Sequence, residues 1–89
     1  MYKLYILYSP TKNRYYVGFT SDELTERLRR HNTNHKGFTG KTGDWEIAYF
    51  ESFITKDEAT KREKLIKSWK SRILIEKLIR STGLEHSDF

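Results

Sequence analysis

Two tyrosines, a glycine, an arginine, a histidine and a glutamate have types and spacings that suit chemistry on a phosphate group. They are Tyr5, Tyr16, Gly18, Arg27, His31 and Glu63. A guanidinium can grip a phosphate through two parallel N–H groups, and such donors stabilise the charge that grows on a phosphate during hydrolysis. One carboxylate near cationic groups fits Mg²⁺, which keeps most of its waters and binds one or two carboxylates together with phosphate oxygens.

The chain lacks the residues or spacings that two other common kinds of reactive site require. The chain has no cysteine, and no serine stands in a G-x-S-x-G elbow, which argues against a nucleophilic triad. The three histidines are His31, His35 and His86, and the first two lack the glutamate of an H-E-x-x-H zinc motif. The chemistry that remains is that of an arginine, two phenols, an imidazole and one carboxylate.

The first two tyrosines lie in segments that predict a β-hairpin. Residues 2–9 (YKLYILYS) and 15–20 (YYVGFT) are short and rich in aromatic and aliphatic residues, which is typical of strands. Between them, residues 10–14 contain Pro10 and Asn13, residue types that favour a turn.

The register of this hairpin decides whether the tyrosines meet. If the pairing is centred between residues 11 and 12, Tyr5 lies opposite Gly18 and Leu7 opposite Tyr16, and all four share one face of the sheet. Gly18 would then leave a gap beside the tyrosines where a ligand or backbone can approach. A slip of one residue would separate the tyrosines.

A basic helix is predicted to follow the hairpin. Residues 20–23 (TSDE) match a capping box, and the helix should run to about Asn32. Leu24 and Leu28 define its buried stripe, and the helical repeat places Arg27 and His31 toward the sheet. An arginine aimed at the sheet needs a charged partner, a phosphate or a route to solvent. A surface ion pair of Arg27 with a glutamate, Glu23 or Glu63, is the alternative to a phosphate.

The second half of the chain predicts one strand and two helices after a glycine-rich loop (32–44). Residues 45–53 (WEIAYFESF) alternate as a strand does. A second capping box at residues 55–58 begins a helix through about Trp69, with Glu63 on the edge of its apolar stripe. A third helix is predicted over residues 72–80, with Gly83 as its stop.

The composition favours a polyanionic partner. Lys and Arg number 17 against 12 Asp and Glu, a formal net charge of +5 over 89 residues. Nucleic acid is the first candidate partner, and a basic surface without a specific partner is the alternative. Candidate phosphate contacts are Arg30, Lys36 and Lys41. No apolar run approaches the roughly 18 residues that span a membrane, so we expect no membrane partner and a cytoplasmic location.

The ordered set of site residues resembles the GIY-YIG nuclease domain, in particular its small stand-alone bacterial members. The resemblance extends from Met1 to about Ile79, and its most specific parts are YYVGFTSDELTERLRRHN and WEIAYFESFITKDEATKREKLIK. It implies an α+β fold, a small three-stranded antiparallel β-sheet flanked by three helices, over residues 1–80, with 81–89 as a tail. It also implies metal-dependent hydrolysis of phosphodiester bonds.

The resemblance assigns roles residue by residue. Tyr5 would be the tyrosine of the GIY element, and Tyr16 and Gly18 would belong to the YIG element. Arg27 would match the essential arginine, and His31 the histidine or tyrosine one turn later. Glu63 would hold a single divalent metal, Mg²⁺ or Mn²⁺. Either tyrosine could serve as base, although a phenol with a pKa of about 10 needs nearby cations or metal-bound water to do so.

Two departures from the family pattern bear on these roles. Lys3-Leu4 replace the Gly-Ile before the first tyrosine, positions that serve the strand. No asparagine occurs after Asn34, so the late asparagine of some members is missing.

We expect an endonuclease that cuts DNA with structural or weak sequence selectivity, in DNA repair or recombination. The sequence leaves DNA against RNA open, and also leaves open a protein partner or a homodimer for targeting. The alternatives are a catalytically silent nucleic-acid-binding module of the same fold and a protein-interaction module.

Overall fold

The first strand of the chain lies in the middle of a three-stranded antiparallel sheet, ordered β2-β1-β3. The computed structural model describes the backbone of residues 1–33 and 43–87 and the side chains of 1–33 and 43–81. In chain order the elements are β1 (Tyr2–Ser9), β2 (Arg14–Thr20), α1 (Leu24–His31), β3 (Glu46–Phe53), α2 (Lys56–Trp69) and α3 (Arg72–Ser87). The predicted α+β fold is confirmed.

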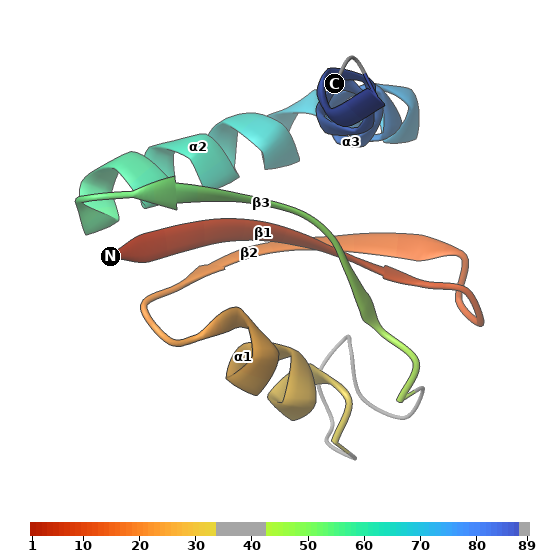
Figure 1. The fold of residues 1–89 in the computed structure, drawn as a ribbon, viewed down its shortest axis with the longest axis horizontal. Coiled ribbons are helices and arrows are strands. Elements are labelled where there is room, and N and C mark those ends of the chain that lie inside the picture. Colours follow the sequence, from red (N-terminus) through yellow and green to blue (C-terminus); the bar gives the residue numbers. More distant parts are fainter. Residues whose placement is uncertain (34–42, 88–89) are drawn as a thin grey trace.

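The sheet separates two hydrophobic layers. Figure 1 shows α1 on one face of the sheet and α2 and α3 on the other. Leu4, Ile6, Val17 and Ile66 form the buried cluster on the α2–α3 face, and Tyr5, Leu7 and Trp45 form the one on the α1 face. Because helices cover both faces, the middle of β1 is buried on both sides, and Leu4, Tyr5, Ile6 and Leu7 are at most 1% exposed.

Of the registers open to the hairpin, the structure has the one that brings the two tyrosines to the same face. Tyr5 pairs with Gly18 and Leu7 pairs with Tyr16. The turn closes through a hydrogen bond from the Asn13 N–H to the Ser9 carbonyl at 2.7 Å, with Asn13 at a φ of +53°. Asparagine tolerates this left-handed conformation better than most residues. The turn therefore fixes which strand residues face each other, and with them the tyrosine pair.

The third strand departs from simple alternation. Ile6 pairs with Tyr49 and Leu7 with Ile47, so Ala48 is an extra residue at a β-bulge. A bulge of one residue reverses the faces to which the following side chains point. Ile47 therefore packs on the α1 face, whereas Tyr49 packs on the α2–α3 face. The alternation of residues 45–53 predicted the strand but did not reveal this change of face.

Of the two capping boxes predicted, one forms. In α2, the Thr55 side chain accepts from the Glu58 N–H, and the Glu58 carboxylate accepts from the Thr55 N–H. The box predicted at the start of α1 is wrong, because Thr20 ends β2 and its hydroxyl accepts from the Asp22 N–H instead. Glu23 is the N-cap of α1 and makes no side-chain cap.

The last helix runs further than the sequence predicts. Lys70, at a φ of +47°, separates α2 from α3, and α3 continues through Gly83 to Ser87. A glycine costs a helix about 1 kcal/mol relative to alanine, which need not end it. Residues 81–87 are thus helical, although we expected them to form part of a tail.

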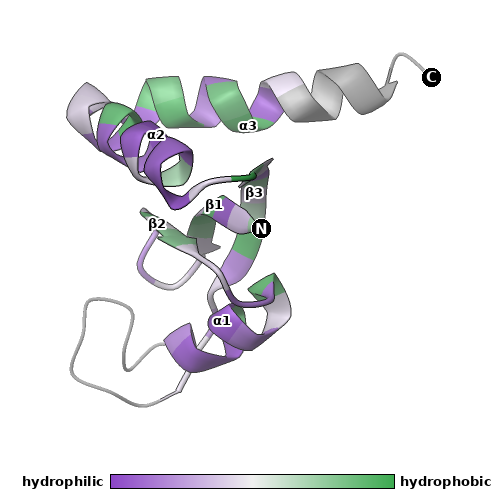
Figure 2. Cartoon of the chain, turned by 90° about the vertical axis from the view of Figure 1, so that its left-hand side faces the viewer, coloured by the Kyte–Doolittle hydropathy of each residue, from purple (hydrophilic) through white to green (hydrophobic). Residues whose placement is uncertain are grey.

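The helices differ in polarity. Figure 2 shows α1 as mostly hydrophilic, while hydrophobic segments run along α3. The role of α1 is therefore mainly to carry polar groups to the sheet, with Leu24 and Leu28 as its apolar contacts. Within residues 1–33 and 43–87, none of the helices has the length and apolar character that crossing a membrane would require.

Candidate active site

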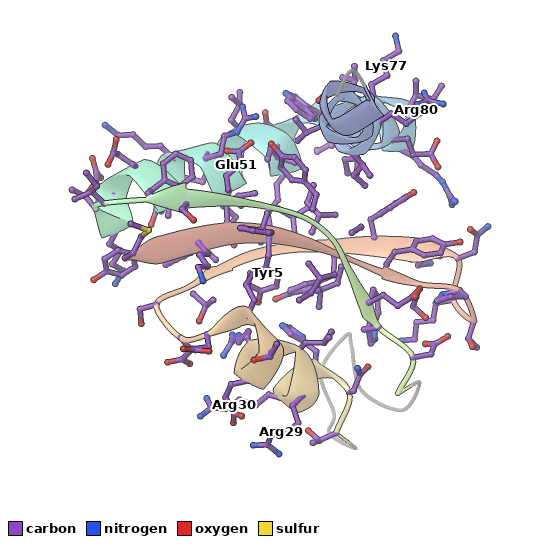
Figure 3. The ribbon with its side chains drawn as sticks, in the orientation of Figure 1. Tyr5, Arg29, Arg30, Glu51, Lys77 and Arg80 are labelled. Carbon is purple, nitrogen blue, oxygen red and sulfur yellow. The ribbon has the colours of Figure 1, made fainter. Side chains whose placement is uncertain are left out.

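The hydroxyl of Tyr5 joins β1 to α1. It lies 2.8 Å from Nε2 of His31, and it accepts an N–H from Nε of Arg27 at 3.2 Å. Arg27 and His31 are four residues apart on α1, so they share one face of the helix. Figure 3 shows Tyr5 between the sheet and α1. The prediction that Arg27 and His31 face the sheet is confirmed.

Tyr16 completes the aromatic surroundings of His31. Its ring centroid lies 4.9 Å from that of His31 and 6.4 Å from that of Tyr5. Tyr5 is 1% exposed and His31 7%, whereas Tyr16 is only partly buried and lines an open groove beside β2. Of the two tyrosines, Tyr16 is therefore the one nearer to solvent.

Gly18 makes room for the Tyr5 hydroxyl. A Cβ at Gly18 would lie 2.8 Å from the Tyr5 oxygen and 3.1 Å from a ring carbon of Tyr16. Both distances are shorter than a van der Waals contact. The gap that the sequence predicted beside Gly18 exists, but the two tyrosine side chains fill it, so it is not an entrance for a ligand.

The Tyr5 hydroxyl stays protonated at neutral pH. Burial is the main reason that its pKa lies above the ordinary value, and the hydrogen bond and charge of Arg27 offset part of that rise. The carboxylate of Glu63 raises the Tyr5 pKa further, which indicates that this charge acts on the site from α2. A standing phenolate at Tyr5 is therefore disfavoured.

Arg27 is anchored through one nitrogen. Its Nε donates to Tyr5, and this hydrogen bond is the first cause of a raised Arg27 pKa. Among the described side chains, Arg27 forms no ion pair, so the alternative partners Glu23 and Glu63 are not used. Its two terminal nitrogens remain to bind an anion.

Glu63 is the carboxylate that α2 offers to the site. Its side chain is 16% exposed, and Oε2 lies 3.3 Å from Nζ of Lys67. The described residues contain no group of three histidine, cysteine, aspartate or glutamate side chains that could hold a metal ion. A single carboxylate fits Mg²⁺ or Mn²⁺ that keeps most of its waters and not a zinc site.

The family follows from a comparison of the whole chain. A sequence model of the GIY-YIG catalytic domain matches residues 1–78 of the 89. The chain belongs to the GIY-YIG family. Searches among curated proteins and among solved structures each found no match. GIY-YIG domains are generally endonucleases that act on nucleic acid and use a divalent metal.

The predicted nucleic-acid contacts of this GIY-YIG domain lie away from Tyr5 or outside the described residues. Arg30 is exposed on the outer side of α1 and lies 3.8 Å from Asp22 and 3.7 Å from Glu26 (Figure 3). Lys36 and Lys41 lie outside the described residues. A role for these three cations stays a prediction.

Sequence reasoning missed two contacts that position the GIY-YIG site. Asn32, at the end of α1, binds Trp45, the residue before β3: its amide nitrogen donates to the Trp45 carbonyl at 3.1 Å, and its oxygen accepts the Trp45 N–H at 2.8 Å. Asp44 accepts from the Ser9 hydroxyl at 2.7 Å and from the Thr11 N–H at 2.8 Å. Both join segments far apart in sequence, which no local pattern indicates.

Lys67 was also missed, although a signal was present. It stands four residues after Glu63 on α2, the spacing at which glutamate and lysine pair on a helix surface.

Proposed function

We propose that this chain is a metal-dependent endonuclease that hydrolyses phosphodiester bonds in DNA. The observation that carries the proposal is the anchoring of Arg27, whose Nε is held by the Tyr5 hydroxyl while its terminal nitrogens stay available. An anchored guanidinium is preorganised for a phosphate and loses little freedom on binding one.

The reaction adds water across a P–O bond. The water oxygen bonds to phosphorus, the bond to one strand end breaks, and a proton passes from the water to the leaving oxygen through protein groups or solvent. Arg27 would hold the non-bridging oxygens of the phosphate, where negative charge grows. Mg²⁺ or Mn²⁺, held by Glu63 and waters, would stabilise charge on the phosphate and the leaving oxygen.

The two tyrosines differ in burial, and we therefore assign them different roles. Tyr5 is 1% exposed and bonded to His31 and Arg27, so we assign it the positioning of both. Tyr16 is partly buried and lines the groove, so we assign it the contact with the attacking water. His31 supports both rings from α1.

One contact favours a second candidate, a nucleic-acid-binding module without turnover. The ion pair between Glu63 and Lys67 occupies the carboxylate that the metal would need. The Lys67 side chain of this pair is 52% exposed, and ion pairs that solvent reaches are worth only about 0–1 kcal/mol, so a metal ion and a substrate phosphate together can displace it. The enzyme is therefore preferred, and an absence of cleavage would favour the binding module.

The test is a Mg²⁺ titration of the wild type with labelled duplex, branched and single-stranded DNA, and with RNA of matched structure. We expect metal-dependent strand scission of at least one DNA, and none by Glu63→Ala at any metal concentration. Binding without scission of any substrate would support the silent module. Cleavage of RNA alone would contradict the choice of DNA.

A further inference from the structure

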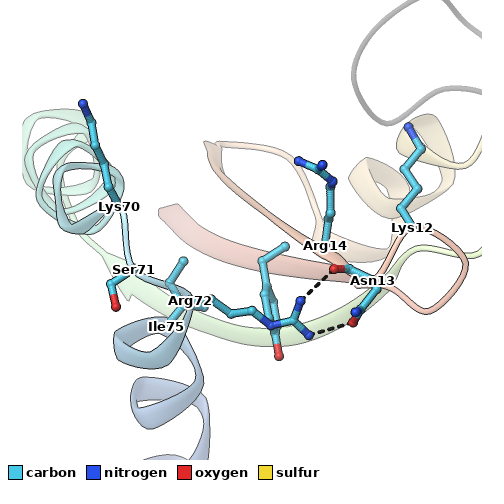
Figure 4. A pocket seen from close by; sticks show the side chains of 8 residues that line it. Lys12, Asn13, Arg14, Lys70, Ser71, Arg72 and Ile75 are labelled. Atoms are coloured by element: carbon cyan, nitrogen blue, oxygen red, sulfur yellow. Dashed lines mark hydrogen bonds between the residues drawn. The ribbon is translucent and has the colours of Figure 1, made fainter.

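A second basic region lies where the β1–β2 turn faces the junction of α2 and α3. The structure has an open pocket of about 700 Å³ there, lined by Lys12, Asn13, Arg14, Tyr15, Lys70, Ser71, Arg72 and Ile75. Figure 4 shows that the residues come from two segments far apart in the chain. Four of these eight described residues carry a positive charge, and none of the eight is a carboxylate.

A second pocket extends this one toward Tyr16 of the candidate active site. An adjoining pocket of about 290 Å³ shares Tyr15, Lys70 and Ile75 with it, and is also lined by Tyr16 and Lys67. Tyr16 packs against His31, and Lys67 pairs with Glu63. The two pockets together form one groove along the outer edge of β2, which reaches Tyr16 and Lys67, the ion-pair partner of Glu63.

The walls of this groove are fixed. Arg72 donates from its terminal nitrogens to the Asn13 carbonyl at 2.8 Å and to Asn13 Oδ1 at 2.7 Å, and from Nε to Glu76 at 3.1 Å. The dashed lines in Figure 4 mark the two contacts with Asn13. Arg72 thus joins α3 to the hairpin turn, and so brings the segment of Arg14 beside that of Lys70.

Two cations of the groove are left for a ligand. Arg14 and Lys70 form no ion pair with the carboxylates that the structure describes. In Figure 4 the side chains of Arg14 and Lys70 extend to the same side of the view, while Arg72 points to Asn13. Two such charges on a fixed frame favour an anion with more than one charged group.

The ring of Tyr15, the aromatic residue that lines both pockets, is already engaged. Tyr15 packs against Tyr8 with ring centroids 4.9 Å apart, the guanidinium carbon of Arg72 lies 5.3 Å from its ring, and its hydroxyl donates to Glu76. Nucleotide bases are usually held by open aromatic faces. The groove therefore suits phosphates and not bases.

We propose that this groove binds the sugar–phosphate backbone of the DNA strand that enters the active site, with Arg14 and Lys70 each contacting a phosphate. The inference rests on the proposed function for its choice of ligand. The contacts carry no sequence information, because phosphates are the same at every position. They would hold the strand beside Tyr16 and Lys67 and so align the phosphate that is cut.

The test is DNA binding without metal, which does not depend on cleavage. Fluorescence anisotropy with labelled duplex and single-stranded DNA, over a range of salt, compares the wild type with Arg14→Gln/Lys70→Gln. Each lost phosphate contact lowers the slope of log K against log[salt] by about 0.7 to 0.9. We expect the slope to fall by about 1.4 to 1.8 and the affinity to fall about 10-fold at moderate salt.

The matched control is Lys77→Gln/Arg80→Gln, which removes the same two charge types from α3. Figure 3 shows Lys77 and Arg80 on the outer side of α3, far from Tyr5. The control should keep nearly the wild-type slope. Equal losses in both double variants, an unchanged slope in Arg14→Gln/Lys70→Gln, or no salt-dependent binding by the wild type would overturn the groove. Wild-type binding without cleavage would instead count against the proposed function.

Discussion

The hydroxyl of Tyr5 and Nε2 of His31 lie 2.8 Å apart, although 26 positions separate the two residues in the chain. This contact joins the buried central strand to a mostly polar helix. The same hydroxyl also holds Arg27, so one buried oxygen fixes two of the polar groups of the site. We therefore expect the loss of the Tyr5 hydroxyl to disturb the geometry of the site more than the loss of any tyrosine hydroxyl that lies outside the groove.

Tyr5→Phe removes this oxygen and keeps the ring. It leaves a buried imidazole nitrogen without its phenol partner, which should cost about 1–3 kcal/mol of stability. Cleavage should fall because Arg27 loses its anchor, and the loss should be larger in kcat than in KM. The control is Tyr8→Phe, whose hydroxyl donates to Asn13 at an exposed position. Equal effects of the two variants on kcat would contradict the positioning role of Tyr5.

Gly18→Ala should act through Tyr5. The new Cβ would lie 2.8 Å from the Tyr5 oxygen, and Tyr5 is too buried to move away, so we expect a loss of about 1–3 kcal/mol. In a Tyr5→Phe background the nearest clash is gone, and the cost of Gly18→Ala should be smaller. Urea unfolding of the two single variants and the double variant measures this coupling. Additive costs would mean that Gly18 does not serve the Tyr5 hydroxyl.

Lys67→Gln should make metal activation easier. It removes the ion pair that holds Glu63, which is worth about 0–1 kcal/mol. The Mg²⁺ concentration for half-maximal cleavage should therefore fall by up to about 5-fold. Lys61→Gln is the control, because Lys61 pairs with Asp57 on the exposed side of the same helix. A higher Mg²⁺ requirement in Lys67→Gln would contradict competition between Lys67 and the metal.

Tyr49 should make the fold sensitive to alkaline pH. Burial first, and then its hydrogen bond to Glu51, raises the pKa of Tyr49 to about 12. The pKa is higher in the folded state than the ordinary value of about 10, so the stabilisation is complete below about pH 10 and is lost as pH rises toward about 12. Urea unfolding from about pH 9 to about pH 12 should show the wild type losing more stability than Tyr49→Phe. A constant difference between the two proteins would refute this.

The sequence predicted the parts of the site that local patterns determine. Turn residues located the hairpin, and one of the registers open to it pairs Tyr5 with Gly18, as the structure does. The helical repeat of Leu24 and Leu28 gave the direction of Arg27 and His31. Each of these features depends only on residues that are neighbours within one strand, turn or helix.

What the sequence could not predict depends on contacts between distant segments. The bulge at Ala48 has no marker residue, and it appears only because Ile47 and Tyr49 pack on different faces. Thr20 could have capped α1, but it is the last residue of β2, and its hydroxyl accepts from the Asp22 N–H instead. The basic groove arises only when the turn around Arg14 meets the junction at Lys70.

In the proposed reaction, Arg27 and Glu63 cut DNA together with a divalent metal. The most direct test of this is single-turnover cleavage in Mg²⁺ by Arg27→Ala and Glu63→Ala, beside Arg29→Ala, which removes an exposed arginine of the same helix that pairs with Glu26. We predict that the first two variants stay folded and lose at least about 10²- to 10³-fold in rate, while Arg29→Ala stays within a few-fold of the wild type. Cleavage that survives both Arg27→Ala and Glu63→Ala would contradict the account.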